Sequence, residues 1–399
     1  MPDSVRVPYG MTVHDAREIA AVVEVLESST QMGPRTAEFE RRVAATYSKR
    51  HGISVNSGSS ALYLAMEALD LPSGSEVITP ALTFATTVGP IVKSGLKPVF
   101  VDVGADTFVA DADRVQDLIG PDTSALLIPN LLGNLPEWDK LRDLADAHDL
   151  VVVEDSADII GARYQGEPIG TYSDVTTASF YGMHVINCAG NGGMVCVNDD
   201  DLADRIRVLR SWGRSSTLFV DSEDIDARLA VEVDGIPYDA KFVFEAIGYN
   251  LEGSEMGAAF GLVQLDKLAD ALEIRHRMCK AQAQFFGRYT EWIDLPRFSP
   301  GVDSVWFAFP LVVREEAPFS RRELQTFLEK RNIQTRAVLT GNITRQPGFR
   351  DIPMRVDPAG LSHTDRIMER GVLVAAHHGL TDRMLAHLHA SFEEFARRY

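Results

Sequence analysis

The sequence has few cysteines and no long apolar run. Its three cysteines, Cys188, Cys196 and Cys279, are an odd number without close pairing, which argues against a disulfide framework and against a four-thiolate cluster. We expect all three to be buried, inert thiols, and we expect no metal site. No apolar stretch is long enough to span a bilayer, and the polar start MPDSVRVPYG does not resemble a signal peptide. These absences predict a cytoplasmic protein.

Positive charge is scarce as well. Lysine and arginine number 39 against 57 aspartates and glutamates, which gives a formal net charge of -18. Such a charge repels phosphate backbones and anionic lipids, so we expect neither nucleic acid nor membrane surfaces as partners. A small anionic substrate is still compatible with a locally basic site.

The chain also lacks repeats, low-complexity tracts and flexible linkers, while a hydrophobic content of 45% supplies a sizeable core. Up to about residue 245, helical patterns alternate with short apolar runs. This alternation predicts an α/β fold with a mostly parallel sheet, because parallel strands need crossover connections and are buried on both faces. The runs are GISVNSG, SEVITPAL, KPVFVDV, SALLIPN, LVVVEDSA, TTASFYG and GGMVCVND. Loops at the carboxyl ends of such strands build the site.

A second pattern begins at Ser254, a suitable N-cap for a helix with apolar periodicity to residue 286. Residues 305–313 predict a strand, and residues 321–331 predict a helix. We therefore expect a large domain over residues 1–253, followed by a linking helix and a smaller α+β domain over residues 254–399.

Polar residues follow two of the expected strands. In Asn56-Ser57-Gly58-Ser59-Ser60-Ala61-Leu62, amides and hydroxyls at the start of a helical pattern could hold a phosphate, although such a loop is often only a turn. Asp155 follows the apolar run LVVV. Its carboxylate could pair with a protonated ring nitrogen of a cofactor, or it could simply cap a helix.

Further candidates lie at other strand ends. In Ser179-Phe180-Tyr181-Gly182-Met183-His184, the serine could bind phosphate and the histidine could transfer a proton near neutral pH. The alternative is an imidazole merely satisfied by backbone groups. Phe84 could stack on a flat ring, although a lone aromatic at such a place is more often part of the core.

Together these segments resemble, in order and spacing, the sugar-nucleotide aminotransferases and dehydratases of the DegT-StrS type. The similar segments are EIAAVVEVLESSTQMGPRTAEFE, VNSGSSALYLAMEAL, SEVITPALTFATT, KPVFVDVGADTFVAD, VVVEDSADIIGA, SFYGMH with AGNGGMV, and IGYNLEGSEMGAAFGLVQLDKL. The resemblance implies the fold-type-I architecture of pyridoxal-phosphate enzymes and a homodimer with sites at the subunit interface. The implied cofactor is pyridoxal 5'-phosphate or its amine form, pyridoxamine 5'-phosphate.

The resemblance also implies roles for single residues. Gly58 and the serines near it would hold the cofactor phosphate, Phe84 would stack on the ring, and Asp155 would pair with the ring nitrogen. Asn250 would reach the phosphate of the neighbouring subunit's cofactor. The full set expected at the cofactor is Ser57, Gly58, Ser59, Phe84, Asp155, Asp158, Ser179 and Asn250.

The chain departs from the aminotransferases at position 184, where they carry the lysine that binds the cofactor covalently. Here the residue is His184, and no lysine occurs between Lys140 and Lys241. Histidine at this place marks the 3-dehydratase branch, which residues 335–347 also resemble. That branch implies removal of the C-3 hydroxyl of a nucleotide-linked 4-keto-6-deoxyhexose. The residues implied for catalysis are His184 and Asp155, and those implied for the substrate are Gly33, Arg336 and Arg345.

One lineage of that branch carries an iron–sulfur cluster in a cysteine-rich segment after a Trp-Gly-Arg run. Here Trp212-Gly213-Arg214 is followed by Ser215-Ser216-Thr217-Leu218-Phe219-Val220, without a cysteine, so we expect no cluster. Glutamate or another amino donor would then restore the amine form of the cofactor. Three other interpretations stay open: an aminotransferase that works without lysine, a dehydratase that receives electrons from a separate protein, and a noncatalytic subunit that binds the cofactor or a nucleotide-sugar.

Overall fold

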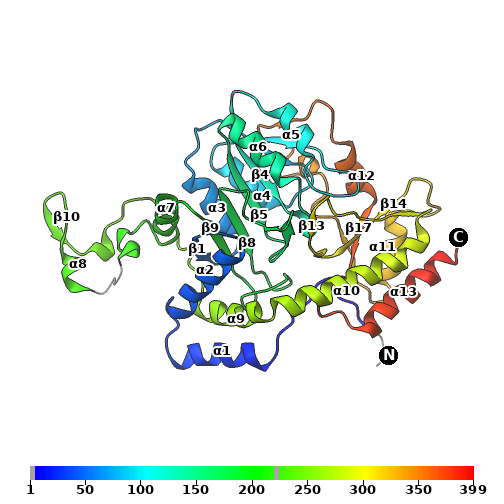
Figure 1. The fold of residues 1–399 in the computed structure, drawn as a ribbon, viewed down its shortest axis with the longest axis horizontal. Coiled ribbons are helices and arrows are strands. Elements are labelled where there is room, and N and C mark those ends of the chain that lie inside the picture. The colour runs from blue at the N-terminus through cyan, green and yellow to red at the C-terminus, as the bar shows by residue number, and fades with distance from the viewer. Residues whose placement is uncertain (1–4, 220–223) are drawn as a thin grey trace.

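The computed structural model describes residues 5–219 and 224–399 (Figure 1). Val220, the last residue of the cysteine-free run named above, lies outside these ranges. Two sheets organise the described residues, one of eight strands and one of four, and helices cover them. The α/β architecture predicted from the sequence is therefore confirmed.

The eight-stranded sheet is mostly parallel. Its order is β1-β9-β8-β5-β4-β2-β3-β16, in which only β9 runs antiparallel to its neighbours β1 and β8. The strands are β1 (His51–Val55), β2 (Glu76–Pro80), β3 (Lys97–Val101), β4 (Thr123–Pro129), β5 (Val151–Ser156), β8 (Val175–Ser179), β9 (Gly193–Val197) and β16 (Arg355–Val356). All of them except β16 coincide with the apolar runs of the sequence.

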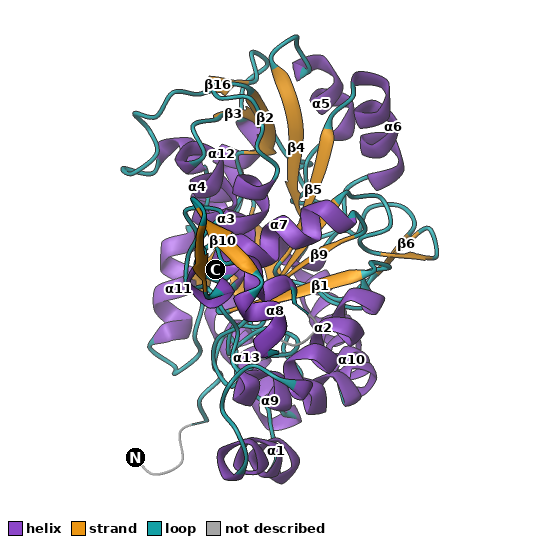
Figure 2. Ribbon diagram, turned by 90° about the vertical axis from the view of Figure 1, so that its left-hand side faces the viewer, coloured by secondary structure: helices purple, strands orange, loops and turns teal. Residues whose placement is uncertain are grey.

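Both faces of this sheet are buried, which explains why its strands are apolar throughout. Along β4, Leu126 and Ile128 join one core with α2, α5 and α6, while Ala125 and Leu127 join another with α3, α4 and α7. Figure 2 shows α3 and α4 on one side of the sheet and α5 and α6 on the other. The helices are α2 (Pro34–Thr46), α3 (Gly58–Ala68), α4 (Ala85–Lys93), α5 (Ala112–Leu118), α6 (Trp138–His148) and α7 (Asp200–Arg210).

The apolar stretch after Ser254 forms two consecutive helices, α9 (Glu255–Asp266) and α10 (Leu268–Phe286), rather than one. Ser254 caps α9 as expected, because its hydroxyl accepts a hydrogen bond from the amide of Gly257 at 3.3 Å. The helices meet at Lys267, whose ammonium lies 2.6 Å from the buried carboxylate of Glu18 in α1 (Ala16–Glu27). This contact fixes α1 against the junction of the two helices.

The four-stranded sheet is antiparallel in the order β12-β14-β17-β15 and shares a core with α10. Its strands are β12 (Ile293–Asp294), β14 (Phe309–Val313), β15 (Arg336–Ala337) and β17 (Gly371–Val374), and its helices are α11 (Arg321–Glu329), α12 (Ser362–Arg370) and α13 (Asp382–Ala396). The strand expected over residues 305–313 is therefore shorter than predicted, and the helix expected over residues 321–331 ends two residues early.

The C-terminal part of the chain also contributes to the large sheet. Strand β16 pairs with β3 at the sheet edge, where the guanidinium of Arg355 lies 2.6 Å from the carboxylate of Glu76. A further sheet consists of β6 (Arg163–Tyr164), β7 (Glu167–Pro168) and β13 (Val302–Asp303). The division into domains at residues 253 and 254 stays a prediction.

Residues 212–219 and 224–250, called the arm below, project from the rest of the molecule (Figure 1). The arm contains α8 (Ile225–Leu229), β10 (Val231–Val233) and β11 (Ile236–Tyr238). Several apolar side chains of the arm are exposed, including Ile236 at 62%, Phe242 at 57% and Ile247 at 96%. Within the described chain nothing covers them.

Candidate active site

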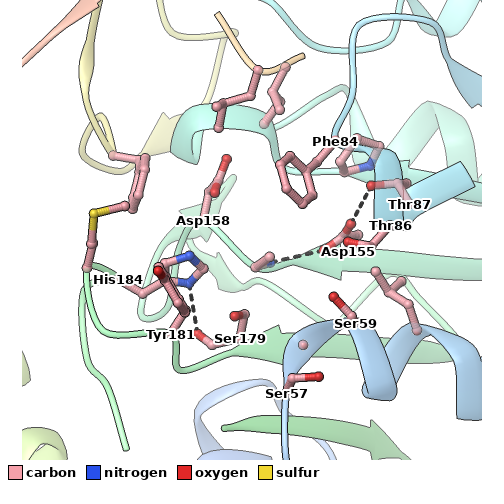
Figure 3. A pocket seen from close by; sticks show the side chains of 18 of the residues that line it. Ser57, Ser59, Phe84, Thr86, Thr87, Asp155, Asp158, Ser179, Tyr181 and His184 are labelled. Carbon is pink, nitrogen blue, oxygen red and sulfur yellow. Dashed lines mark hydrogen bonds between the residues drawn. The ribbon is translucent and has the colours of Figure 1, made fainter. Parts of the chain in front are cut away.

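A cavity of about 390 Å³ lies at the carboxyl ends of β4, β5 and β8, where the large sheet meets Phe307 and Leu339 (Figure 3). The topology of the parallel sheet brings the ends of strands that are far apart in the sequence to this one edge. The predicted cofactor and catalytic residues that line the cavity are Ser57, Gly58, Ser59, Phe84, Asp155, Asp158, Ser179 and His184.

One wall of the cavity is the start of α3. The hydroxyl of Ser57 caps this helix by accepting a hydrogen bond from the amide of Ser60 at 3.1 Å. The hydroxyls of Ser59 and Ser179 have no hydrogen-bond partner among the described residues, and both residues line the cavity. Together with the first amides of α3, these hydroxyls form a group of donors suited to a phosphate.

Two glycines allow α3 to approach the sheet closely. A Cβ atom on Gly58 would lie 2.5 Å from the Cβ of Ser179, and a Cβ atom on Gly193 would lie 2.3 Å from the carbonyl oxygen of Ser57. Either side chain would force the helix away from β8 and β9. The group of donors therefore depends on both glycines.

Asp155 lies at the end of β5 beside the cavity. Its Oδ2 accepts a hydrogen bond from the hydroxyl of Thr87 at 2.8 Å, and its Oδ1 accepts one from the amide of Ala157 at 3.1 Å. Burial raises the pKa of Asp155 in spite of these bonds. No cation pairs with the carboxylate in the described chain, so the environment favours a positively charged ligand group such as a protonated ring nitrogen.

Asp158 presents a second carboxyl group to the cavity. Its Oδ2 accepts a hydrogen bond from the amide of Leu132 at 2.8 Å. Burial, together with the nearby Asp155, raises the pKa of Asp158 to about 7. Both carboxyl groups therefore hold a proton more tightly than an exposed aspartate does.

His184 is oriented by one hydrogen bond. Its Nδ1 lies 3.0 Å from the carbonyl oxygen of Ser179, which assigns the ring proton to Nδ1 and leaves Nε2 as the acceptor. A backbone hydrogen bond with Ala157 also acts on the imidazole and, like the one to Ser179, favours its protonated form. Burial lowers the pKa of His184 to about 4, so the imidazole is neutral at pH 7 and can take up a proton.

The cavity contains little positive charge. Among the described residues no lysine or arginine lines it, while Asp155 and Asp158 do. An anionic ligand must therefore be balanced by backbone amides, hydroxyls or groups from outside this cavity. Phe84, which is 48% exposed, lines the same cavity and has a ring face available for stacking.

Two of the predicted residues lie away from the cavity. Asn250 is exposed at the base of the arm, where its backbone pairs with that of Ser211. Gly33 precedes α2, and its amide donates a hydrogen bond to the carboxylate of Glu255 at 2.8 Å. A role for either residue at the cavity requires a second subunit.

The two predicted arginines differ in their surroundings. Arg345 is held by Asp365, with 2.5 Å between guanidinium and carboxylate. The guanidinium of Arg336 lies 5.6 Å from the ring centre of Tyr9, and Tyr9 lines the cavity. Arg336 also borders an open groove beside α11. The structure therefore connects Arg336, but not Arg345, to the cavity wall.

Sequence reasoning missed several residues of the site. Tyr9 comes from a coil near the N-terminus and Phe307 from the segment before β14, so no motif marks either of them. Thr87, the partner of Asp155, lies in the first turn of α4. Arg275, which lies behind Phe307, does carry a signal in the sequence, because it occupies a buried position on the apolar side of α10.

The cysteines, the groups that could bind a metal and the helices that could span a membrane were considered separately in the sequence. Cys188, Cys196 and Cys279 are free and buried, as predicted. Residues 5–219 and 224–399 contain no group of three or more histidines, cysteines, aspartates or glutamates placed to hold a metal ion. No helix of the described chain combines the length and apolar character needed to cross a bilayer.

Comparison with known proteins gives consistent matches along nearly the whole chain. Residues 13–393 match the DegT/DnrJ/EryC1/StrS aminotransferase family. The dTDP-4-dehydro-2,6-dideoxy-D-glucose 3-dehydratase of Saccharopolyspora spinosa is 35% identical, over 98% of this chain and 86% of that protein. The lipopolysaccharide biosynthesis protein RfbH of Salmonella typhimurium is 34% identical, over 98% of this chain and 91% of that protein.

A solved structure shows the same fold. The Escherichia coli GDP-4-keto-6-deoxy-D-mannose-3-dehydratase with bound hydrated pyridoxal phosphate superimposes with a TM-score of 0.88 at 24% identity, covering 98% of this chain and 100% of that one. The fold-type-I architecture expected from the sequence is confirmed. From the family match and the relatives above 30% identity, we conclude that this chain belongs to the DegT/DnrJ/EryC1/StrS aminotransferase family.

Proposed function

We propose that this protein is a pyridoxamine-phosphate-dependent dehydratase that removes the C-3 hydroxyl of a nucleotide-linked 4-keto-6-deoxyhexose in deoxysugar biosynthesis. One observation carries the proposal. His184 lines the cavity with a neutral imidazole, and the resemblance to the family implies that it takes the place of the aminotransferases' lysine. The 3-dehydratase from Saccharopolyspora spinosa, at 35% identity, supports the same reaction class.

The residues of the cavity fit this cofactor. The free hydroxyls of Ser59 and Ser179 and the start of α3 suit its phosphate, while the buried Asp155 suits a protonated pyridine nitrogen. A side chain at position 58 would collide with Ser179 of β8, so the close spacing of α3 and β8 beside the cavity requires a glycine there. Phe84 would stack on the ring, and Asp158 presents its carboxyl group to the same cavity (Figure 3).

When bound, pyridoxamine phosphate supplies its amine to the 4-keto group and ends as the aldehyde form with release of ammonia, while the C-3 centre goes from C–OH to C–H. Asp155 keeps the proton on the ring nitrogen, which makes the ring an electron acceptor. Glutamate or another amino donor is then needed to restore the amine.

His184 supplies the base. Its neutral Nε2 removes a proton from the cofactor's methylene carbon, and its Nδ1–H bond to Ser179 prevents the imidazole from turning away. Phe307 packs edge-on against the imidazole at 5.3 Å between ring centres, which limits the access of water. A lysine would offer an amine here, whereas histidine leaves the cofactor free to act without a covalent bond to the protein.

The test is a titration of the purified protein with pyridoxamine phosphate, followed by a panel of 4-keto-6-deoxy nucleotide sugars. Absorbance reports cofactor binding, and mass spectrometry reports the sugar product. Loss of the C-3 oxygen supports the dehydratase. Cofactor binding with unchanged sugars across the panel would instead favour the noncatalytic binding subunit.

An aminotransferase-like reaction is the second candidate, because the family itself is described as an aminotransferase family. It predicts an amino sugar that keeps its C-3 hydroxyl. The same mass spectrum distinguishes the two reactions, because replacing a keto oxygen by an amine and losing a hydroxyl change the mass differently.

We further propose that the enzyme works as a homodimer and without an iron–sulfur cluster. The exposed apolar side chains of the arm support a second copy as the covering partner, and they place Asn250 at the base of a surface that such a copy would contact. Iron and sulfide analysis of anaerobically purified protein tests the cluster, and activity that requires an added reductase would favour the dehydratase with a separate electron donor.

A further inference from the structure

A fully buried arginine lies behind the wall of the cavity. Arg275 of α10 has no exposed surface, and its hydrogen bonds run to uncharged groups. Its Nε donates to Nδ1 of His378 at 3.2 Å, and its Nη1 donates to the carbonyl oxygen of Phe307 at 3.0 Å. Its Nη2 is buried and has no hydrogen-bond partner. Within the described chain no carboxylate lies within ion-pair distance of this guanidinium.

Packing and stability do not explain such a residue. Burying an uncompensated charge costs several kcal/mol, and an apolar side chain of similar length would fill the same space. Burial lowers the pKa of Arg275, but only to about 10, so the guanidinium is charged at neutral pH. A positive charge is thus held permanently at this position.

Phe307 lies between the guanidinium of Arg275 and the imidazole of His184. The guanidinium carbon lies 5.9 Å from the ring centre of Phe307, and the imidazole of His184 lies 5.3 Å from the same centre, edge to face. The arginine is held to the backbone of the very residue that separates it from the imidazole. The three side chains therefore form a fixed series from α10 to the cavity.

The other groups around His184 act in the opposite direction. Asp155 and Asp158, at and just after the end of β5, line the same cavity, and a carboxylate there favours a protonated imidazole when it is ionised, as do the backbone hydrogen bonds of His184 with Ser179 and Ala157. Tyr181 of the same loop contacts the imidazole edge-on, and burial raises the pKa of Tyr9 of the N-terminal coil, so its phenol is neutral near pH 7. On the far side of Arg275, burial lowers the pKa of His377 to about 4 and that of His378 to about 3, so both are neutral. Arg275 is the fully buried cation in this surrounding, and a second cation, Arg336, lies beside Tyr9.

We propose that Arg275 is a positioning residue that acts through Phe307, its fixed charge disfavouring protonation of His184 and so weakening the hold of the imidazole on a proton. This inference rests on the proposed function of His184 as the base. Arg275 itself touches no reacting atom. Its effect is electrostatic, so a lysine at position 275 preserves it and an uncharged residue abolishes it.

The expected size follows from the geometry. The two distances to the ring centre of Phe307 place the guanidinium and the imidazole no more than about 11 Å apart. At that separation and an effective dielectric of ~20, one full charge shifts a pKa by about one unit. Removing the charge should therefore raise the pKa of His184 by about one unit.

The experiment is an NMR titration of protein labelled at the histidine Cε1 carbon, with and without pyridoxamine phosphate. The His184 signal is identified by its absence in His184→Asn. We expect Arg275→Gln to raise the pKa of His184 by about one unit and Arg275→Lys to leave it near the wild-type value. Arg288→Gln is the matched control, because Arg288 also lies over a phenyl ring, 4.5 Å from the centre of Phe285, but is exposed.

An unchanged His184 titration in a folded Arg275→Gln protein would overturn the inference, as would failure of Arg275→Lys to preserve the wild-type value. If Arg275→Gln does not fold, Arg275→Met takes its place, because an uncharged side chain of similar length fills the same space, and an unchanged His184 titration in that variant overturns the inference. The titration is independent of turnover. A charge-dependent His184 shift in a protein without dehydratase activity would therefore reject the proposed function and keep the electrostatic role of Arg275.

Discussion

At the scale of the residue, the site is built from polar side chains whose capacity for hydrogen bonds and ion pairs is only partly used within the chain. His184 is neutral and bonded through Nδ1 to the carbonyl oxygen of Ser179, and Asp155 accepts two hydrogen bonds but faces no cation in the described chain. Each of these hydrogen bonds fixes the orientation of a side chain, and both side chains can still interact with a ligand in the cavity. Such groups are costly in an empty pocket and become favourable when a ligand completes them.

Replacing His184 tests the first of these groups. His184→Asn should lower turnover by about 10²–10⁴-fold, because a single positioned base contributes that much, while the affinity for pyridoxamine phosphate should stay close to wild type. Steady-state rates and absorbance titration measure the two quantities. His148→Asn, at the exposed end of α6, is the control. Full activity in His184→Asn would refute the assignment.

Asp158 has an effect on stability whose sign can be worked out. Its pKa is about 7 in the folded chain against an ordinary value of 3.8, so between about pH 4 and pH 7 the folded protein holds a proton that the unfolded chain has lost. Stability must therefore fall as the pH rises through this window. Asp158→Asn removes this dependence and should gain on the order of 4 kcal/mol relative to wild type at pH 7, but not at pH 4.

Urea denaturation of the cofactor-free protein at both pH values measures this difference. Asp117→Asn, on the exposed side of α5, is the control. A wild-type protein and an Asp158→Asn variant with parallel pH profiles would show that the carboxyl group titrates normally.

Single residues also show where sequence reasoning reached its limit. Asp155, Ser179 and His184 were predictable because each adjoins the end of an apolar strand, and parallel topology brings such ends together. Tyr9 and Phe307 were not, because they come from irregular segments that only the folded chain brings to the cavity. The positions of Tyr9 and Phe307 at the cavity depend on long-range contacts that no local sequence pattern encodes. A role of Asn250 or Gly33 at the cavity would likewise depend on contacts with a second subunit.

At the scale of the element, the distance between α3 and β8 decides the shape of the cofactor cavity. Gly58→Ala would place a methyl group 2.5 Å from the Cβ of Ser179, so one element has to move. Such overpacking should cost about 1–3 kcal/mol in unfolding free energy and weaken pyridoxamine phosphate binding at least tenfold. Thermal denaturation and absorbance titration test both effects.

Gly120→Ala provides the matched control for that substitution, because a Cβ atom there would meet no atom within 4 Å. It should leave both stability and cofactor affinity nearly unchanged. Equal cofactor affinities in the two variants would mean that the spacing of α3 and β8 is not what shapes the phosphate end.

Most elements of the large sheet follow from the sequence, because strands buried on both faces are continuous apolar runs. The exceptions have physical causes. Lys267 interrupts the apolar stretch between α9 and α10, where it binds Glu18 instead of continuing the helix. Strand β16 has only two residues, too short for a pattern, and its position depends on the pairing of Arg355 with Glu76.

At the scale of the whole molecule, the arm is the feature that a single chain does not complete. Ile236→Asp would place a charge in its exposed apolar surface, where the side chain is 62% exposed and supports no core of its own. If a second copy covers the arm, this change should weaken the dimer at least tenfold without unfolding the chain. Sedimentation equilibrium measures the dissociation constant.

Tyr399→Asp is the control for the arm, since Tyr399 is half exposed at the C-terminus, far from the arm (Figure 1). A wild-type protein that sediments as a monomer, or an Ile236→Asp dimer as tight as wild type, would contradict the proposed role of the arm.

The return of β16 to the edge of the large sheet determines how the molecule can move. A domain that closes over a site as a lid is attached at one hinge. The C-terminal part is instead joined to the large sheet twice, through α10 and through β16 with the ion pair of Arg355 and Glu76. With two attachments, the C-terminal part cannot rotate as a whole without breaking the pairing of β16 with β3. Ligands must therefore enter the cavity through movements of side chains or of a neighbouring subunit rather than by the swing of a domain.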